Sequence, residues 1–284
     1  MDNEGVIQPI RAFGPPMDPA TPRRWEELTT EEAGRLPATA VAVLPFASIE
    51  QHGPHLPLNT DLLIAQAIVD AALTRLPAAI PALSLPALAV GHSPEHGGFP
   101  GTLTAAPETL LALGRDVAGS LHRSGIRRLV LFNAHGGNPP ILQLLAVELR
   151  TRLGMLVAVP ALWGADGLPA GLVAPDEAAY GLHGGAVETA LILHLRPDLV
   201  RTGRIGAFPS SAAGLDRVHR QLRVHGANTL GWATQDLNPS GAIGDARGAD
   251  ATLGGRILDH AAGALATLIE ELHRLPAGWL KDRS

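Results

Sequence analysis

The chain has 284 residues and a formal net charge of −5, with 22 basic and 27 acidic side chains. It contains no basic run and no apolar stretch of the roughly 20 residues that span a bilayer, so we expect neither a nucleic-acid nor a membrane partner. The absence of cysteine excludes disulfides, thiolate metal sites and a cysteine nucleophile, which leaves His, Asp and Glu as metal ligands.

Residues 1–24 contain five prolines and show no apolar period, which predicts an extended N-terminal arm ahead of one domain over residues 25–284. Asp2 and Glu4 stand where a secretion signal carries positive charge, so we expect the protein in the cytoplasm. A short helix is predicted over residues 25–36, with Thr29 or Thr30 as its N-cap.

Apolar strands and amphipathic helices alternate along the rest of the chain. The predicted strands are 39–45, the apolar stretch 79–90, 128–133 and 155–160, and the predicted helices are 61–76, 107–123, 139–152, 189–195 and 251–272. Segments 160–180 and 201–250 read as loops. This order predicts an α/β fold, a single-domain three-layer sandwich whose mostly parallel central sheet is flanked by helices. Functional residues are expected on the loops that leave the carboxyl ends of the strands.

The first of these loops carries a cluster of ionisable side chains. Glu50 and His52 alternate out of the strand end, and Gly53 and Pro54 bend the chain so that Asp61 can return toward them. Two carboxylates and an imidazole together can bind a metal ion. The simpler interpretation is a helix cap at Asp61 with solvated polar residues in the loop.

Two further clusters follow. His135 lies just past strand 128–133 within the sequence NAHGGN, which is equally consistent with an anion site at a helix start, although neither phosphate-loop pattern is present. Glu188 follows His183 by five residues and enters an apolar helix, where a carboxylate can also simply complement the helix dipole. Sheet geometry places His135 at the same edge as Glu50 and His52, so a metal site becomes the stronger interpretation when the three clusters are taken together.

Four motifs, in order, resemble those of the creatininase family of metal-dependent amidohydrolases. They are PFASIEQHGPHLPL at 45–58 followed by Asp61, GHSPEHGGFPGT at 91–102, NAHGGN at 133–138 and HGGAVET at 183–189. The resemblance covers residues from about 25 to 272 and implies the layered α/β fold already derived from the pattern of strands and helices.

The resemblance implies a site for two divalent metal ions. In it Glu50 and His135 bind one ion, His52 binds the other and Asp61 bridges both. Creatininase itself carries a further ligand Glu where this chain has Gly137, so we expect Glu188 to replace it as the fifth ligand and to count among the catalytic groups. Mixed nitrogen and oxygen ligands favour Zn or Mn, with Fe as a third choice.

The resemblance also implies roles around the metals. His183 is the expected proton donor to the leaving nitrogen, and Ser93 the expected substrate contact. Trp163 and Tyr180 are expected to line the substrate pocket. Glu95 and His96 are expected to orient the metal ligands.

We therefore expect a hydrolase that cleaves a C–N bond of a small-molecule amide, lactam or formamide with metal-activated water. Ala179 and Tyr180 replace a Trp-Asp pair of creatininase, so creatinine is not the expected substrate. Alternatives are cleavage of a cyclic ketone or a peptide by the same family architecture, a phosphate- or nucleotide-binding module, and a metal-stabilised oligomer without activity. The family resemblance further implies a homo-oligomer, a hexamer.

Overall fold

The computed structural model describes residues 24–161, 167–279 and 281. Trp163 and nearly all of the expected N-terminal arm lie outside the described residues. The division of the chain at residue 24 therefore stays a prediction.

Four parallel strands form the central sheet in the order β2-β1-β3-β4. Their bounds are Val41–Phe46 for β1, Ala82–Ser84 for β2, Arg128–Asn133 for β3 and Leu156–Ala158 for β4. The two central strands pair along their whole length, from Val41 beside Arg128 to Phe46 beside Asn133. Every residue of β1 is buried, as its unbroken apolar run predicts for a strand covered on both faces.

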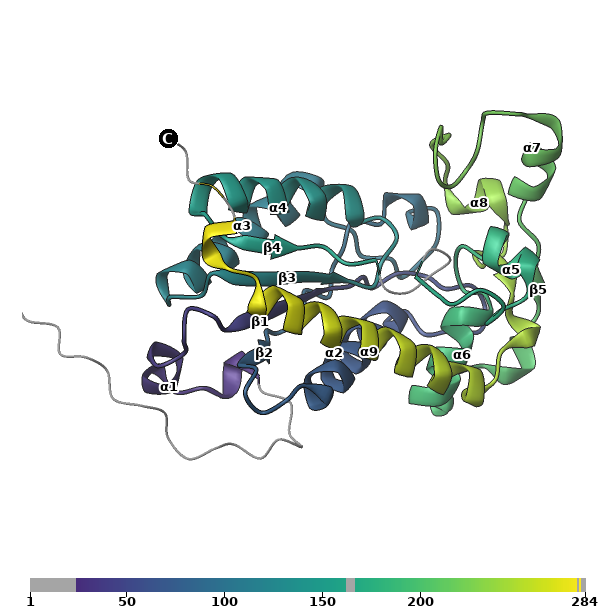
Figure 1. The fold of residues 1–284 in the computed structure, drawn as a ribbon. Coiled ribbons are helices and arrows are strands. Elements are labelled where there is room, and N and C mark those ends of the chain that lie inside the picture. Colours follow the sequence, from purple (N-terminus) through teal and green to yellow (C-terminus); the bar gives the residue numbers. More distant parts are fainter. Residues whose placement is uncertain (1–23, 162–166, 280, 282–284) are drawn as a thin grey trace, which may run out of the picture.

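Helices cover both faces of this sheet (Figure 1). One face packs against α2 (Thr60–Arg75) and α9 (Ala251–Arg274), with α6 (Ala186–Leu195) packed against these two helices, and the other face packs against α3 (Pro107–Arg123) and α4 (Pro139–Leu153). Successive residues of β1 alternate between these two cores, with Val43 in the first and Leu44 in the second. The predicted three-layer α/β fold is thus confirmed.

The predicted elements begin close to their sequence signals. Helices α3 and α4 begin at Pro107 and Pro139, where the missing proline N–H costs no helical hydrogen bond. The expected helix at 25–36 is shorter, a 3₁₀ turn at Trp25–Glu27 followed by α1 at Thr30–Gly34. Thr29 caps α1 through a reciprocal pair of hydrogen bonds with Glu32, which confirms one of the two predicted caps.

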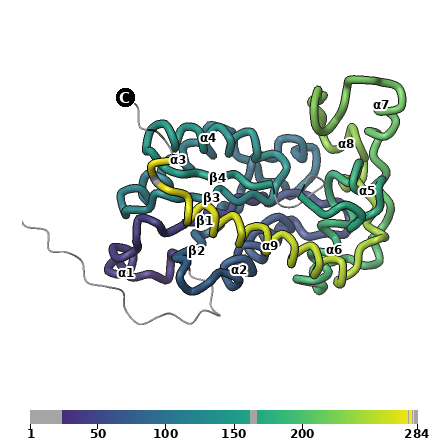
Figure 2. Tube along the Cα trace, in the orientation of Figure 1, coloured from purple at the N-terminus to yellow at the C-terminus, as the bar shows by residue number. Residues whose placement is uncertain are grey.

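The segments expected to be loops contain short regular elements, which corrects the sequence analysis. They are α5 (Pro175–Tyr180), α7 (Ala212–Val218), α8 (Thr234–Leu237) and an antiparallel pair of β5 (Ala207–Phe208) with β6 (Gly244–Asp245). Single 3₁₀ turns occur at Pro94–His96, Pro197–Leu199, Thr202–Arg204, Ala246–Gly248 and Ala277–Trp279. Elements of two to seven residues are too short to show a hydrophobic period. Helices α5, α7 and α8 gather with α6 at one end of the molecule (Figure 2).

Among the described residues, no helix is both long and apolar enough to cross a bilayer.

The opposite end of the sheet is fixed by Arg128, the first residue of β3. Its guanidinium is buried and donates hydrogen bonds of 2.8–2.9 Å to three backbone oxygens, those of Ala38, Leu272 and Leu275. Two of these oxygens lie at the end of α9, where the helix dipole is negative and stabilises a cation. Arg128 therefore joins the start of β3 to the last helix of the fold.

Substituting Arg128→Met should lower the free energy of unfolding by about 3 kcal/mol, because three backbone carbonyls lose the charged donor that the buried arginine supplies. Urea denaturation of the purified variant measures this change. The exposed Arg152→Met serves as the control and should change stability by less than about 0.5 kcal/mol. Equal stability of the two variants would contradict the role of Arg128.

Candidate metal centre

The loop after β1 brings three ionisable side chains into contact. Glu50 and His52 lie on this loop and Asp61 lies in the first turn of α2, and all three are buried. Gly53 turns the loop with a φ of 67°, and a Cβ there would lie 2.6 Å from that of Ala242. The loop therefore needs glycine at its bend to return the chain to Asp61.

His135, just past β3, joins the first side of this group. Its Nε2 donates to the backbone oxygen of His92 at 2.8 Å, which leaves Nδ1 free to face the carboxylates. Nδ1 lies 3.0 Å from Oε2 of Glu50 and 3.3 Å from Oδ2 of Asp61. These three atoms form one group with the spacing of metal ligands.

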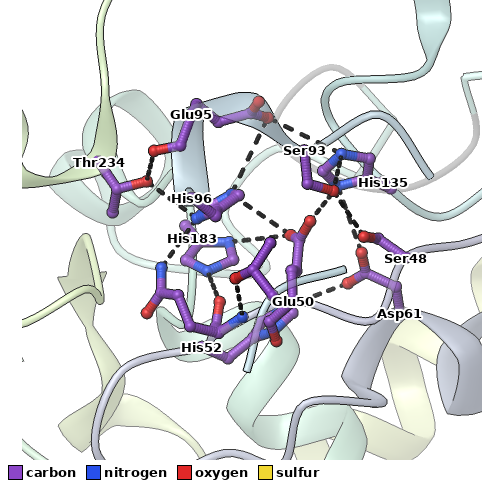
Figure 3. Close-up of polar contacts among 12 residues, drawn as sticks. Ser48, Glu50, His52, Asp61, Ser93, Glu95, His96, His135, His183 and Thr234 are labelled. Atoms are coloured by element: carbon purple, nitrogen blue, oxygen red, sulfur yellow. Dashed lines mark hydrogen bonds and ion pairs between the residues drawn. The ribbon is translucent and has the colours of Figure 1, made fainter. Parts of the chain in front are cut away.

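Asp61 also faces a second group (Figure 3). Its Oδ1 lies 3.0 Å from Nε2 of His52, whose Nδ1 donates to the backbone oxygen of Glu50 at 3.1 Å. Oε2 of Glu188 lies 3.8 Å from the same Nε2. Asp61 therefore stands between Glu50 and His135 on one side and His52 and Glu188 on the other.

The electrostatics of this cluster are dominated by burial and by charges of opposite sign. Burial opposes protonation of His52, but Asp61, Glu188 and Glu50 outweigh it and raise its pKa to about 9. Burial likewise opposes protonation of His135, yet Glu50 and Asp61 raise its pKa well above the ordinary value. Burial raises the pKa of Glu188 to about 7, against the attraction of His52. Without other cations, protons on the imidazoles offset the negative charge.

The donor set fits divalent metal ions. Oε2 of Glu50 and Oδ2 of Asp61 are buried and accept no hydrogen bond within the described part of the chain, although both are strong acceptors. Ligand atoms around a tetrahedral zinc ion lie roughly 3.3 Å apart when each bond is about 2.05 Å. The contacts of 3.0–3.8 Å match that spacing, and metal bonds would satisfy both oxygens.

His183 lies beside both groups. Its Nε2 donates to the backbone oxygen of Gln51 at 2.5 Å, and its Nδ1 lies 3.7 Å from Oε1 of Glu50. Its ring centroid is 4.2 Å from that of His52. Burial, together with the neighbouring His52 and His96, lowers the pKa of His183 well below its ordinary value, so the ring is neutral.

A cavity of about 440 Å³ opens onto the cluster. Glu50, Asp61, His135, His183 and Glu188 line it from the sheet edge. The rest of its lining is largely apolar and includes Val159, Leu168, Val173, Val187 and Trp232. We call these residues the apolar wall. The arrangement can hold an organic substrate with one polar bond next to the ionisable groups.

The other predicted substrate contacts differ in position. Ser93 is buried and shares hydrogen bonds with Ser48 Oγ at 2.6 Å and with His135 Nε2 at 3.1 Å, so its hydroxyl already serves the protein. Tyr180 donates to Asp216 at 3.4 Å and is not among the cavity-lining residues. Their substrate roles stay predictions, as does that of Trp163, which lies outside the described residues.

Gly137, where the resemblance to creatininase places a ligand Glu, has no room for a side chain. A Cβ there would lie 2.1 Å from the backbone oxygen of His92 and 2.6 Å from Nε2 of His135. The carboxylate of Glu95 lies nearby, with Oε1 3.8 Å from the same nitrogen. Glu188 therefore stays the predicted fifth ligand, and Glu95 reaches His135 from the outer side.

Sequence reasoning missed three supporting residues. Gln51 contacts His96 at 2.8 Å, and the hydroxyl of Thr234 lies 2.9 Å from the same ring nitrogen. Glu177 accepts from the backbone nitrogens of Ala186 and Asp245 at 2.6 Å each, which fixes the start of α6 and so the turn that carries Glu188. Only Gln51 carried a sequence signal, its place between two predicted ligands.

Comparison with known proteins gives a consistent result. Residues 26–269 match the family model for creatininase, described as creatinine amidohydrolase. A mycofactocin precursor peptide peptidase from Mycobacterium ulcerans (strain Agy99) is 35% identical over 241 residues, which cover 81% of this chain and 85% of the relative.

Two solved creatininase structures cover 89% of this chain. One, named as the Mn form, has a TM-score of 0.72 at 27% identity and is covered over 100% of its length. The other, a variant of the Zn-Zn type, has a TM-score of 0.71 at 28% identity and is covered over 98%. The family model, the curated relative and the two structures agree with the geometry of the site: this chain belongs to the creatininase family of metal-dependent hydrolases.

Proposed function

We propose that the protein is a dinuclear metal-dependent amidohydrolase that cleaves a C–N bond with water. The observation that carries this proposal is the position of Asp61, whose two oxygens face two separate groups of nitrogen and oxygen ligands. Glu50, Asp61 and His135 would hold one ion, and His52, Asp61 and Glu188 the other. The mixed donor set is suited to Zn or Mn, and also accepts Fe.

Two bound ions would activate a water molecule for attack and polarise the substrate carbonyl. The transfer of protons during the reaction then depends on His183. Because its Nε2 hydrogen is directed at Gln51, its Nδ1 carries the lone pair that faces Glu50 and the cavity. His183 can accept a proton from the attacking water and pass it to the leaving nitrogen, and its lowered pKa favours release of that proton from the protonated ring.

The apolar wall of the cavity supports a substrate larger than creatinine, with an apolar group next to the scissile amide. The indole nitrogen of Trp232 donates to the backbone oxygen of Val224 at 2.8 Å, which holds the ring in place on this wall. From the sequence we expect a C–N bond of a small amide, lactam or formamide rather than a peptide bond. The name of the Mycobacterium ulcerans relative favours a peptide C–N bond, and we retain a lactam or formamide as the second candidate.

A phosphate- or nucleotide-binding module has less support. The side chain of Asn138, at the start of α4, accepts from the backbone nitrogen of His92 at 3.0 Å and donates to Asn133, so it is already used within the protein. The carboxylates of Glu50, Asp61 and Glu188 would also repel a phosphate in the neighbouring cavity.

The homo-oligomeric state, a hexamer, and the cytoplasmic location remain part of this proposal. Light scattering on the purified protein decides the first, and fractionation of cells that express the chain decides the second.

Metal binding should depend on pH, because the ring of His52 holds a proton below its pKa of about 9 in the metal-free protein. An ion must displace this proton, so the apparent affinity should rise by up to about tenfold per pH unit between pH 6.5 and 9. Calorimetric titration of the metal-free protein with Zn or Mn, in buffers of different ionisation enthalpy, measures the released protons. Affinity that does not change with pH would contradict this assignment.

The same raised pKa predicts a trend in the stability of the metal-free protein. The paired His52 stabilises the fold fully below its unfolded pKa of about 6.5, and this contribution is lost as the pH rises to about 9. The increase in Tm on adding metal should therefore be larger at pH 9 than at pH 6.5. Thermal denaturation at both values tests the sign.

Replacing Glu188→Gln should remove the charge that holds the ion beside His52 and lower the metal content by about one ion per chain. Hydrolysis of an amide panel should fall by at least about 100-fold, since activation of water depends on both ions. Elemental analysis after dialysis gives the metal content. The exposed Glu108→Gln removes the same charge elsewhere and should leave both values unchanged.

Replacing Trp232→Ala should raise KM for amides or peptides that carry a large apolar group, because the substitution removes part of the apolar wall. A change of roughly 10-fold in KM, with kcat largely retained, is expected. Steady-state kinetics on matched substrates with and without the apolar group measures the effect. Equal losses for both substrates would contradict a specificity role.

A further inference from the structure

The histidine pair His96 and His183 lies against Glu50. His183 also lies within ligand distance of His52 and Glu188, whereas His96 belongs to neither of the two groups described above. His96 is buried, and its Nε2 lies 3.4 Å from Oε1 of Glu50. Glu50, His96 and His183 each place one ligand atom within 4.8 Å of the others, which is the spacing of a further metal group. Whether Nε2 of His96 carries a hydrogen decides between a metal ligand and a hydrogen-bond donor.

The side chain of Gln51 has a fixed orientation. Its Oε1 accepts a hydrogen bond of 2.9 Å from the backbone nitrogen of Gly53. Its Nε2 donates a hydrogen bond of 2.9 Å to the backbone oxygen of Gly241. A backbone N–H can only donate and a backbone C=O can only accept, so the amide cannot be reversed without losing both bonds.

This orientation determines the tautomer of His96. The second hydrogen of the Gln51 amide is directed at Nδ1 of His96, 2.8 Å away, so Nδ1 must accept. The hydroxyl of Thr234 lies 2.9 Å from the same Nδ1 and 2.9 Å from the backbone oxygen of Glu95, and its single hydrogen can serve either acceptor. The hydrogen of the neutral ring is therefore on Nε2, which faces Glu50 and, at 3.9 Å, Oε1 of Glu95.

We propose that Gln51 is a positioning residue that holds His96 as its Nε2–H tautomer, so that His96 donates to Oε1 of Glu50 and does not bind a metal ion. The function assigned to Glu50 in this proposal rests on the proposed metal centre, whereas the tautomer of His96 does not.

As a consequence, the two oxygens of Glu50 have different functions. Oε1 faces Nε2 of His96 at 3.4 Å, and Oε2 faces Nδ1 of His135 and has no hydrogen-bond partner in the described part of the chain. The carboxylate would thus present one oxygen to an ion and keep the other for the protein. The backbone oxygen of Gln51 also accepts from Nε2 of His183, so this one residue sets the protonation pattern of both rings.

The first test needs neither metal nor substrate. Two-bond proton–nitrogen correlation spectra of metal-free protein with ¹⁵N-labelled histidine distinguish the two neutral tautomers from the imidazolium, and comparison with His96→Gln assigns the signals. We expect His96 to carry its hydrogen on Nε2. A hydrogen on Nδ1, or on both nitrogens, would overturn the proposal.

The second test changes the donor. In Gln51→Glu a carboxylate can only accept, so Nδ1 of His96 must take a hydrogen and the tautomer signal should invert. Metal affinity, measured by competition with a chelator, should fall roughly 10- to 100-fold, and kcat should fall more than KM rises. Gln66→Glu, which adds the same charge at an exposed position of α2, should change none of these values.

A third variant, Gln51→Met, tests the proposal if the Gln51→Glu protein does not fold. Gln51→Met keeps the length of the side chain but removes its donor, so the spectrum should show a loss of the single tautomer. An unchanged Nε2–H signal in this variant would overturn the role of Gln51. A correct tautomer in a protein that binds no metal and hydrolyses no amide would instead overturn the proposed function alone.

Discussion

The stability of this structure depends on balancing the repulsion among the carboxylates that the fold buries at one edge of its sheet. Glu50 and Asp61 are buried and line the same cavity as Glu188, where unbalanced negative charge is strongly unfavourable. Imidazoles are interleaved with them, and the opposite shifts in the pKa of Glu50, held well below its ordinary range, and of His52 record this mutual dependence. The burial of Glu50 alone would act in the other direction. Divalent ions would balance the same charge more completely than protons do.

The two ends of the sheet are held by buried charges of opposite sign. At the start of β3, Arg128 is a buried cation surrounded by backbone oxygens, and its function is to hold strand and helix together. At the other end, Glu177 is a buried anion surrounded by backbone nitrogens, and it fixes the turn before α6. Burial raises the pKa of Glu177, against these two hydrogen bonds. A firm scaffold on both sides allows the ionisable groups between them to be held close together.

The parts of the molecule that sequence predicted are those with a local signal. The apolar run of β1 and the prolines that begin α3 and α4 each act within a few residues, and the carboxyl edge of the sheet then places Glu50 beside His135. The contact of Thr234 with His96 joins residues 138 positions apart through a segment without periodicity, so no local pattern could reveal it. Contacts of that kind are set by packing of the whole chain.

The close fit of Gly137 against the backbone of His92 also bears on how members of this family diverge. The resemblance to creatininase places a ligand Glu at this position, yet here a single exchange from glycine would push a side chain into a peptide oxygen. A chain of this kind cannot therefore acquire that ligand by one amino-acid change. Movement of the neighbouring loop would have to accompany it, so the two ligand arrangements are separated by an evolutionary barrier of coupled substitutions.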